Sequence, residues 1–346
     1  MTDLRKLTEF REQYQAYLYR MDVNTFVLES MGLMYMDTPK AGGTSLKTRL
    51  AQLEAGYKAP HDSSSHEAAS EMFIHDQAIN PLKPVTAYEE QLQEKILFSS
   101  NWKRFCVVRN PFSRLFSAWF SKVLLRQPGY LEALPGYELP ELVTSTEEVY
   151  AAFERFVDYL AEFGCDSNPH WDRQVLLLFS GTLEWDKVFR FENLQEELSS
   201  ATDLFGEHQL TLEHLNVSGF SPNWEMISPK TKNLITSLYA CDFEAYGYSL
   251  EQPRGPSNVD LLPVYINAVV ARNKRISQLI ARYESQLSTS SELEERVRAL
   301  EQELEVRIRA LEQELEEQTR SLHELQSSRS WRLTAPLRKM KRVIAR

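Results

Sequence analysis

One short segment constrains the fold of this chain more than any other: Thr38-Pro-Lys-Ala-Gly-Gly-Thr-Ser-Leu-Lys47. It follows an apolar run over 32–36 and precedes a helical pattern that continues to about Ala55. The order predicts a strand, a tight loop and a helix in succession. A helix N-terminus presents unpaired backbone N–H groups and a positive dipole end, so the segment predicts an anion-binding loop. It is not a Walker A motif, because Gly-x4-Gly-Lys-[Ser/Thr] is absent.

The residue types in this loop suit an anion. Gly42 and Gly43 let the backbone approach a ligand closely. Thr44 and Ser45 can cap the helix or donate hydroxyl groups, and Lys40 adds a positive charge. The alternative is an ordinary strand–turn–helix in which the hydroxyl residues serve only as caps.

A second segment, residues 104–119, reads as a strand, a sharp turn and a helix. Phe105–Val108 is a buried strand run, Asn110 is a good N-cap and Pro111 fits the first helical position. Arg109 then falls at the carboxyl end of the strand, the edge of a parallel sheet where ligands bind. An arginine there can hold a phosphate through two charge-assisted hydrogen bonds, or it can pair with a local carboxylate.

Together the two segments resemble the sulfotransferases that use 3'-phosphoadenosine-5'-phosphosulfate (PAPS). The resemblance is greatest to the carbohydrate sulfotransferases of the Golgi and their bacterial relatives, and it covers roughly residues 30–250. Weaker matches continue in order downstream: Asn168-Pro-His-Trp171, 185–194, 214–218 and 239–248. One departure is Asn110, where many relatives carry Asp.

The resemblance implies a role for each residue of the donor site. The loop holding the 5'-phosphosulfate would comprise Pro39, Lys40, Gly42, Gly43, Thr44 and Ser45. The 3'-phosphate would be bound by Arg109 and by Ser117, eight residues later, and Asn216 and Ser218 would contact the 3'-phosphate or the adenosine.

Sulfuryl transfer to a hydroxyl requires a donor held in line, a neutralised leaving phosphate and a base for the hydroxyl proton. Lys40 is suited to the bridge between phosphate and sulfate. His75, on a predicted strand edge between the two phosphate motifs, is our preferred base, and His170 beside Trp171 is its rival. Either histidine alone would by default be a hydrogen-bonded structural imidazole. We see no metal-ligand spacing and expect no metal.

Alternating strands and helices predict an α/β fold, a P-loop-like parallel sheet flanked by helices, followed by a C-terminal helical coiled coil. The expected parts are an N-terminal helix over 1–30, a sulfotransferase domain over 31–250, a helical linker over 251–285, a coiled coil over 286–328 and a basic tail over 329–346. Within the domain we expect a short strand over 71–75, a loop over 128–140, helices over 146–163 and 228–246, and a core strand over 188–191.

The coiled-coil prediction rests on an internal repeat. Residues 296–305 recur as 307–316 with a period of eleven, which favours slight right-handed supercoiling or a nearly straight coil. The repeat carries an apolar seam spaced 4, 3, 4, 4, 3, 4 that predicts self-association: Leu293, Val297, Leu300, Leu304, Ile308, Leu311 and Leu315. The alternative is a solitary helix stabilised by Glu–Arg pairs.

Charge and cysteine content bear on partners and compartment. The net charge of -10 argues against general nucleic-acid binding. The tail over 329–346 holds seven Lys and Arg and no acid, which suits either an anionic membrane surface or a disordered solubilising tail. Three cysteines without metal or disulfide spacing favour a reducing compartment, and residues 1–20 lack the apolar region of a signal peptide. We therefore expect a bacterial-type cytoplasmic enzyme; of the two alternatives for the tail, the membrane-binding one would bring it to the inner face of the membrane.

The sequence thus predicts an oligomeric sulfotransferase that transfers a sulfuryl group from PAPS to a hydroxyl of a carbohydrate or glycolipid. One rival is a P-loop kinase-like phosphotransferase, disfavoured by the missing Walker Lys-[Ser/Thr] pair and Mg²⁺ carboxylate. The other is a non-catalytic coiled-coil assembly factor with a degenerate nucleotide fold, disfavoured by intact Lys40, Arg109 and Ser117.

Overall fold

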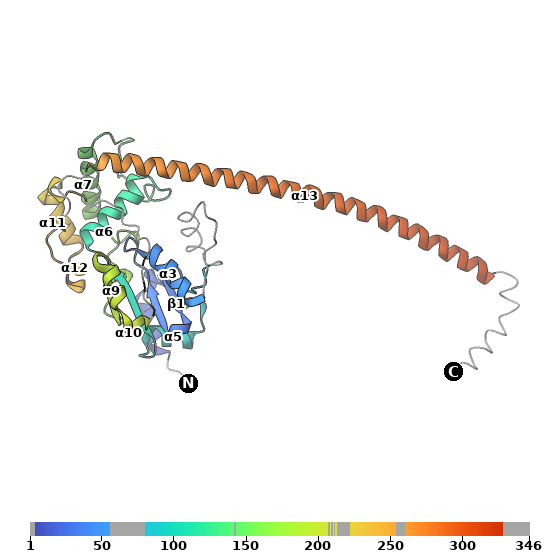
Figure 1. Ribbon diagram of the computed structural model, residues 1–346, viewed down its shortest axis with the longest axis horizontal. Coiled ribbons are helices and arrows are strands. Elements are labelled where there is room, and N and C mark those ends of the chain that lie inside the picture. Colours follow the sequence, from blue (N-terminus) through green and yellow to red (C-terminus); the bar gives the residue numbers. More distant parts are fainter. Residues whose placement is uncertain are drawn as a thin grey trace. The chain divides into compact units, whose positions relative to one another are not determined.

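The structure is a computed structural model of the chain (Figure 1). It describes residues 4–55, 80–141, 143–206, 208, 210, 212, 222–253 and 260–327. The chain divides into two compact units, residues 1–269 and 270–346. Three groups of predicted features lie outside the described residues: the strand over 71–75 with His75, the loop residues Asn216 and Ser218, and the basic tail over 329–346.

The first unit is built on a four-stranded sheet with the strand order β1-β2-β3-β4. Its strands are β1 (Thr25–Leu28), β2 (Leu33–Met36), β3 (Lys103–Val108) and β4 (Lys187–Arg190). β2, β3 and β4 are parallel, as predicted, and their register places Met36 opposite Cys106 and Val108 opposite Arg190. The apolar runs before the two phosphate motifs are therefore neighbouring strands that end at the same edge.

Two predictions are wrong at and before the edge strand β1. It is antiparallel to β2, so the sheet is mixed rather than wholly parallel. The connection is the short turn η2 (Glu29–Met31) followed by Gly32 with φ 60°, which allows a hairpin and is far too short for a parallel crossover. The expected helix over 1–30 is also broken, into α1 (Arg5–Gln13), η1 (Gln15–Tyr17) and α2 (Tyr19–Val23) before β1 begins.

Both faces of the sheet are covered by helices, because alternate side chains of each strand point to opposite faces. Phe105 and Val107 join a core cluster with α3 (Gly43–Ala55), α9 (Leu194–Ser200) and α10 (Thr202–Phe205). Cys106 and Val108 join the cluster on the other face, which contains side chains of α1, α5 (Glu90–Phe98) and the segment around Phe179. Figure 1 shows these helices around the strands. The observed fold is thus an α/β sheet flanked by helices.

A third core cluster is helical and follows the second phosphate motif. It includes side chains of α6 (Pro111–Ala118), the π-helix η4 (Trp119–Leu124), α7 (Thr146–Phe163), α11 (Pro229–Leu238) and α12 (Ala240–Tyr246). The predicted helix over 146–163 is confirmed, with Ser145 as its N-cap. The predicted helix over 228–246 is two helices that meet at Tyr239. The remaining short elements are η3 (Val85–Ala87), α8 (Gln174–Leu177), η5 (Phe191–Asn193) and η6 (Trp224–Met226).

The helix α13 (Leu261–Ser327) extends into the second unit. Its first residues belong to the first unit, where Leu261 and Tyr265 are buried in the helical core cluster. A helix over 286–327 is therefore confirmed, whereas pairing with another chain stays a prediction. Among the described helices, none combines the length and the apolar character that crossing a membrane requires.

Candidate functional site

A cavity of about 820 Å³ opens at the carboxyl edge of β2 and β3. Every predicted donor-site and catalytic residue that the structure describes lines this cavity: Pro39, Lys40, Gly42, Gly43, Thr44, Ser45, Arg109, Ser117 and His170. They come from three segments that are far apart in the sequence. The structure therefore brings the two phosphate motifs and one of the two candidate bases into a single site.

The loop between β2 and α3 is shaped by its backbone. Lys40 and Gly42 have positive φ values of 70° and 82°. The carbonyl of Thr38 accepts a hydrogen bond from Ala41 N at 3.1 Å, which closes the turn. At Gly42 an added Cβ would stand 3.1 Å from Phe191 Cε2, so a side chain there would be crowded as well as strained. The loop leads directly into the N-terminus of α3, the arrangement expected of an anion-binding loop.

The buried carboxylate of Asp37 helps to fix the loop. The sequence analysis did not identify this residue. Its Oδ2 accepts from Lys47 Nζ at 3.0 Å and its Oδ1 accepts from the Tyr35 hydroxyl at 3.0 Å. Burial raises the pKa of the Asp37 carboxyl, but the charge and hydrogen bond of Lys47, together with the Tyr35 hydrogen bond and the charge of Arg20, outweigh it, so the pKa lies below its usual value. Asp37 is thus a buried carboxylate in an ion pair. Its position at the end of an apolar strand, ten residues before Lys47, was the available signal.

Asp37 also explains why position 43 is glycine. A Cβ added to Gly43 would stand 1.8 Å from Asp37 Oδ1, which is far inside contact distance. The carboxylate therefore lies against the first residue of α3 and leaves no room for a side chain.

Arg109 joins the second motif to the first. Its Nη1 donates to the carbonyl of Lys40 at 2.9 Å, and its guanidinium carbon lies 4.4 Å from the centre of the Phe191 ring. Its Nε is buried and has no hydrogen-bond partner among the described residues. Burial lowers the pKa of Arg109 to about 10, against an opposing effect of Glu192, so the group is still cationic at neutral pH. A cation held in this way fits a phosphate ligand.

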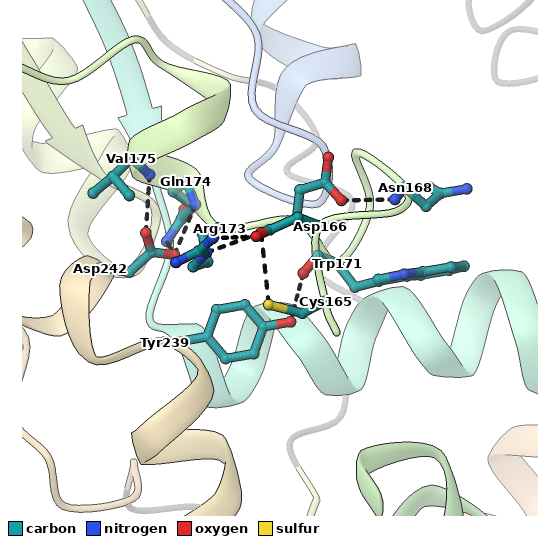
Figure 2. A network of polar contacts seen from close by, with 10 residues as sticks. Cys165, Asp166, Asn168, Trp171, Arg173, Gln174, Val175, Tyr239 and Asp242 are labelled. Carbon is teal, nitrogen blue, oxygen red and sulfur yellow. Dashed lines mark hydrogen bonds and ion pairs between the residues drawn. The ribbon is translucent and has the colours of Figure 1, made fainter. Parts of the chain in front are cut away.

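Gln174 holds the backbone of Arg109 through two hydrogen bonds. Its Oε1 accepts from Arg109 N and its Nε2 donates to Arg109 O, both at 2.9 Å. The backbone N–H of Gln174 in turn donates to Asp242 at 2.8 Å, as does that of Val175 at 2.9 Å. Figure 2 shows Asp242 facing these two residues. The position of Arg109 is therefore set by α8 and α12 before any ligand binds.

Lys40 reaches the helix that follows Arg109. Its Nζ donates to Ser121 Oγ at 2.6 Å, and Ser121 Oγ donates to the carbonyl of Ser117 at 2.8 Å. Ser121 lies in the π-helix η4, and such turns occur frequently at functional sites. The sequence analysis singled out Ser117, but it predicted neither the π-turn nor the contact between Lys40 and Ser121.

Two buried arginines hold the loop through hydrogen bonds to backbone carbonyls. Neither was identified from the sequence. Arg114 donates to the carbonyls of Pro39 at 3.1 Å, Asp172 at 2.7 Å and Pro169 at 2.8 Å. Arg20 donates to the carbonyl of Asp37 at 2.7 Å. Because these donors reach backbone carbonyls on both sides of the cavity, they fix the loop and the segment before α8 relative to each other.

His170 lies at the cavity with its ring between two partners. Its Nδ1 is 3.0 Å from Asn168 Oδ1 and its Nε2 is 3.4 Å from the Tyr130 hydroxyl. Burial, followed by the positive charges of Lys122 and Lys40, lowers the pKa of His170 to about 2. The imidazole is therefore neutral at neutral pH, and without a ligand it is a weak base.

The segment that carries His170 is itself held by polar contacts. Arg173 pairs with Asp166, and Asn168 N donates to Asp172 Oδ1 at 2.6 Å. The Tyr239 hydroxyl donates to the carbonyl of Trp171 at 2.5 Å. Figure 2 shows this network between the segment over 165–175 and α12. His170 thus stands on a rigid support.

Another wall of the cavity is formed by η4 and by the residues that come after it in the sequence. Lys122, Gln127 and Tyr130 line it, and Lys122 Nζ donates to Gln127 Oε1 at 2.8 Å while lying 4.9 Å from the centre of the Tyr130 ring. The sequence predicted a loop over 128–140. Tyr130 is the member of that loop that reaches the cavity.

Residues 23–249 match the family described as the sulfotransferase family, and the chain belongs to it. The match begins at the end of α2 and ends just after α12, so it includes the whole sheet and every described residue of the cavity except Tyr19.

Among curated proteins, the chain is similar to carbohydrate sulfotransferase 10 of Homo sapiens, with 28% identity over 185 residues, 50% of this chain and 49% of that protein. It is 25% identical to carbohydrate sulfotransferase 10 of Gallus gallus over 244 residues, 64% of this chain and 66% of that protein. Carbohydrate sulfotransferase 11 of Danio rerio shows 23% identity over 247 residues, with the same shares. The chain thus spans about half the length of the first of these relatives. No solved structure matches the chain significantly.

Proposed function

We propose that the protein transfers a sulfuryl group from PAPS to a hydroxyl of a carbohydrate or glycolipid acceptor. The family membership and the names of the relatives support the reaction and the class of acceptor. The observation that carries the proposal is the meeting of Lys40, Arg109 and His170 in one cavity. An anion-binding loop, a phosphate-binding cation and a neutral base are the groups that the reaction needs.

In this proposal the donor is held by its two phosphate groups. The loop over 38–45 and the N-terminus of α3 bind the 5'-phosphosulfate, and Arg109 with Ser117 binds the 3'-phosphate. Asn216 and Ser218 remain proposed contacts to the 3'-phosphate or the adenosine. The buried, unpartnered Nε of Arg109 fits a negatively charged ligand.

The chemical step is an in-line displacement at sulfur. The acceptor oxygen forms a bond to sulfur as the bond from sulfur to the bridging phosphate oxygen breaks, and adenosine 3',5'-bisphosphate leaves. Lys40 stabilises the negative charge that develops on the bridging oxygen. The contact between Lys40 Nζ and Ser121 supports this role, because it keeps the ammonium group at the wall of the cavity.

The acceptor proton passes to a histidine. Of the two candidates, His170 has geometric support, because it lies in the same cavity as Lys40, whereas His75 lies outside the described residues. The negative charges of a bound donor would raise the pKa of His170 and so strengthen it as a base. His75 stays a candidate, and paired variants separate the two.

The experiment that tests the function has a binding arm and a turnover arm. Adenosine 3',5'-bisphosphate should raise the melting temperature of the full chain, whereas ATP and buffer alone should not. With PAPS and a panel of oligosaccharides, sulfated product should form. Stabilisation by ATP in place of the bisphosphate would indicate a phosphotransferase, and the absence of nucleotide binding would refute the proposed donor site.

A further inference from the structure

The second unit presents an apolar surface along α13. We define the seam as Leu293, Val297, Leu300, Leu304, Ile308, Leu311 and Leu315. Each of these side chains is between 47% and 65% exposed. An apolar stripe of this length on a soluble helix is typical of a surface that packs against another helix.

The spacing of the seam residues does not determine whether two copies of the helix would pair in a parallel or an antiparallel arrangement. The intervals 4, 3, 4, 4, 3, 4 are the same when read from either end, with Leu304 at the centre. A second copy of the helix could therefore match every seam residue in a parallel or an antiparallel arrangement. The choice between the two must come from the charged residues beside the seam.

Those charges are divided by sign. With eleven residues in three turns, successive residues are about 98° apart around the helix axis. Arg296 and Arg307 then lie about 65° to one side of the line through Leu304, and Glu301 and Glu312 lie about 65° to the other. Directly beside the seam, one flank is thus basic and the other acidic; further round, at about 98°, Glu303 and Glu314 lie on the first side and Glu305 and Glu316 on the second.

In an antiparallel pair each flank faces the same flank of the partner, so arginine would meet arginine and glutamate would meet glutamate. In a parallel pair each flank faces the opposite one, so the basic flank meets the acidic flank. The separations also fit, because Glu301 follows Arg296 by five residues and Glu312 follows Arg307 by five. This is the offset at which flanking residues of parallel, in-register helices form interchain ion pairs.

The seam residues also indicate how many helices associate. The β-branched residues Val297 and Ile308 each precede a leucine by three residues, at Leu300 and Leu311. β-branched residues followed in this way by leucine favour two-stranded parallel coils. We therefore propose that α13 forms a parallel, in-register homodimer through the seam. The proposal does not depend on the function proposed above, because none of these residues lines the cavity.

A first experiment tests the dimer with the full chain. Light scattering at micromolar concentration should give twice the mass of one chain. Leu304→Lys combined with Leu311→Lys should reduce it to one chain, because a lysine pair at the centre of the seam is both charged and desolvated. Val306→Lys is the matched control, since Val306 is 67% exposed but faces away from the seam. A monomeric wild type, or a lysine variant that stays dimeric, would overturn the proposal.

A second experiment tests the direction. Leu315→Cys should form an interchain disulfide rapidly under mild oxidation, because in a parallel register each Leu315 lies opposite its copy. In an antiparallel pair it would lie opposite Leu293 and should not crosslink to itself. Gln313→Cys, on the far face of the helix, and the wild-type chain with its native cysteines are the controls. Crosslinking at 315 no faster than at 313 would refute the parallel register.

A third experiment tests the charges. Arg296→Glu with Arg307→Glu should weaken the dimer, because both flanks then become acidic. Adding Glu301→Arg and Glu312→Arg restores opposite flanks and should recover most of the affinity. Failure of this second pair to recover the dimer would exclude the flanking pairs as the source of orientation.

Discussion

Arg109 Nη1 donates a hydrogen bond to the backbone carbonyl of Lys40 at 2.9 Å, so the two phosphate motifs are in direct contact before a donor is present. They are separated by 69 positions in the sequence. Because of this contact, a substitution of either residue can alter the position of the other. Variants of the two should nevertheless fail in different ways.

Lys40→Ala should lower kcat far more than it weakens nucleotide binding, because the ammonium group is needed most as the sulfur–oxygen bond breaks. We expect a loss of about 100-fold or more in kcat, the scale seen when a charge-stabilising group is removed. Turnover and calorimetric binding of adenosine 3',5'-bisphosphate would be compared. Equal losses in both would show that Lys40 serves only in binding.

Arg109→Ala should weaken binding of adenosine 3',5'-bisphosphate by roughly 2–4 kcal/mol, as expected for the loss of a charge-assisted phosphate contact. Binding of adenosine 5'-monophosphate, which lacks the 3'-phosphate, should change much less. Arg190→Ala is the control, because Arg190 donates to Tyr246 O at 2.7 Å and does not line the cavity. Wild-type affinity in the Arg109 variant would refute the 3'-phosphate assignment.

His170→Ala should retain nucleotide binding and lower the rate of sulfation by about 100-fold or more, as expected for a general base. His75→Ala, measured beside it, should then remain active. If the His75 variant loses activity and the His170 variant keeps it, the base is His75, as the sequence had favoured. His208→Ala serves as the common control, since His208 does not line the cavity.

The low pKa of His170 also predicts how stability depends on pH. Because its pKa is lowered to about 2 in the folded protein, the unfolded chain binds a proton below pH 6.5 that the folded chain does not. Stability should therefore fall as the pH falls, by about 2 kcal/mol between pH 7 and pH 5 from this residue alone. Denaturation of His170→Gln at the two pH values should show a smaller fall. Equal falls in variant and wild type would contradict the lowered pKa.

Gly43→Ala should destabilise the fold, because the new Cβ would displace Asp37 from its ion pair with Lys47. Disrupting a buried pair costs roughly 3–5 kcal/mol. The comparison is Gly129→Ala, where an added Cβ meets nothing within 4 Å and the residue has φ of +85°. A Gly43 variant as stable as the Gly129 variant would show that Asp37 can move aside at little cost.

The features that the sequence predicted correctly are local ones. The strand before each motif, the N-cap at Asn110 and the start of α3 follow from neighbouring residues, and the structure confirms them. β1 was missed because a four-residue strand with three apolar residues cannot be distinguished by pattern from the continuation of a helix. Its antiparallel pairing depends on the turn that follows it.

The supports of the site could not be predicted for a different reason. Arg114 is bonded to carbonyls 55, 58 and 75 positions away, and every residue has a carbonyl. A backbone acceptor leaves no trace in the sequence, so the bracing by Arg114 and Arg20 appears only in three dimensions. The choice between His75 and His170 was open for the same reason, since it depends on which histidine the fold carries to the cavity.

The bracing of the loop has a consequence for how a ligand binds. Arg20, Arg114 and the Asp37–Lys47 pair hold the backbone over 37–43 in place without a ligand. The conformational entropy of ordering that backbone is therefore lost when the chain folds, and little of it remains to be lost on association. The loop therefore has its binding conformation before the nucleotide arrives. The association rate constant should be set by diffusional encounter rather than by a slow rearrangement of the loop.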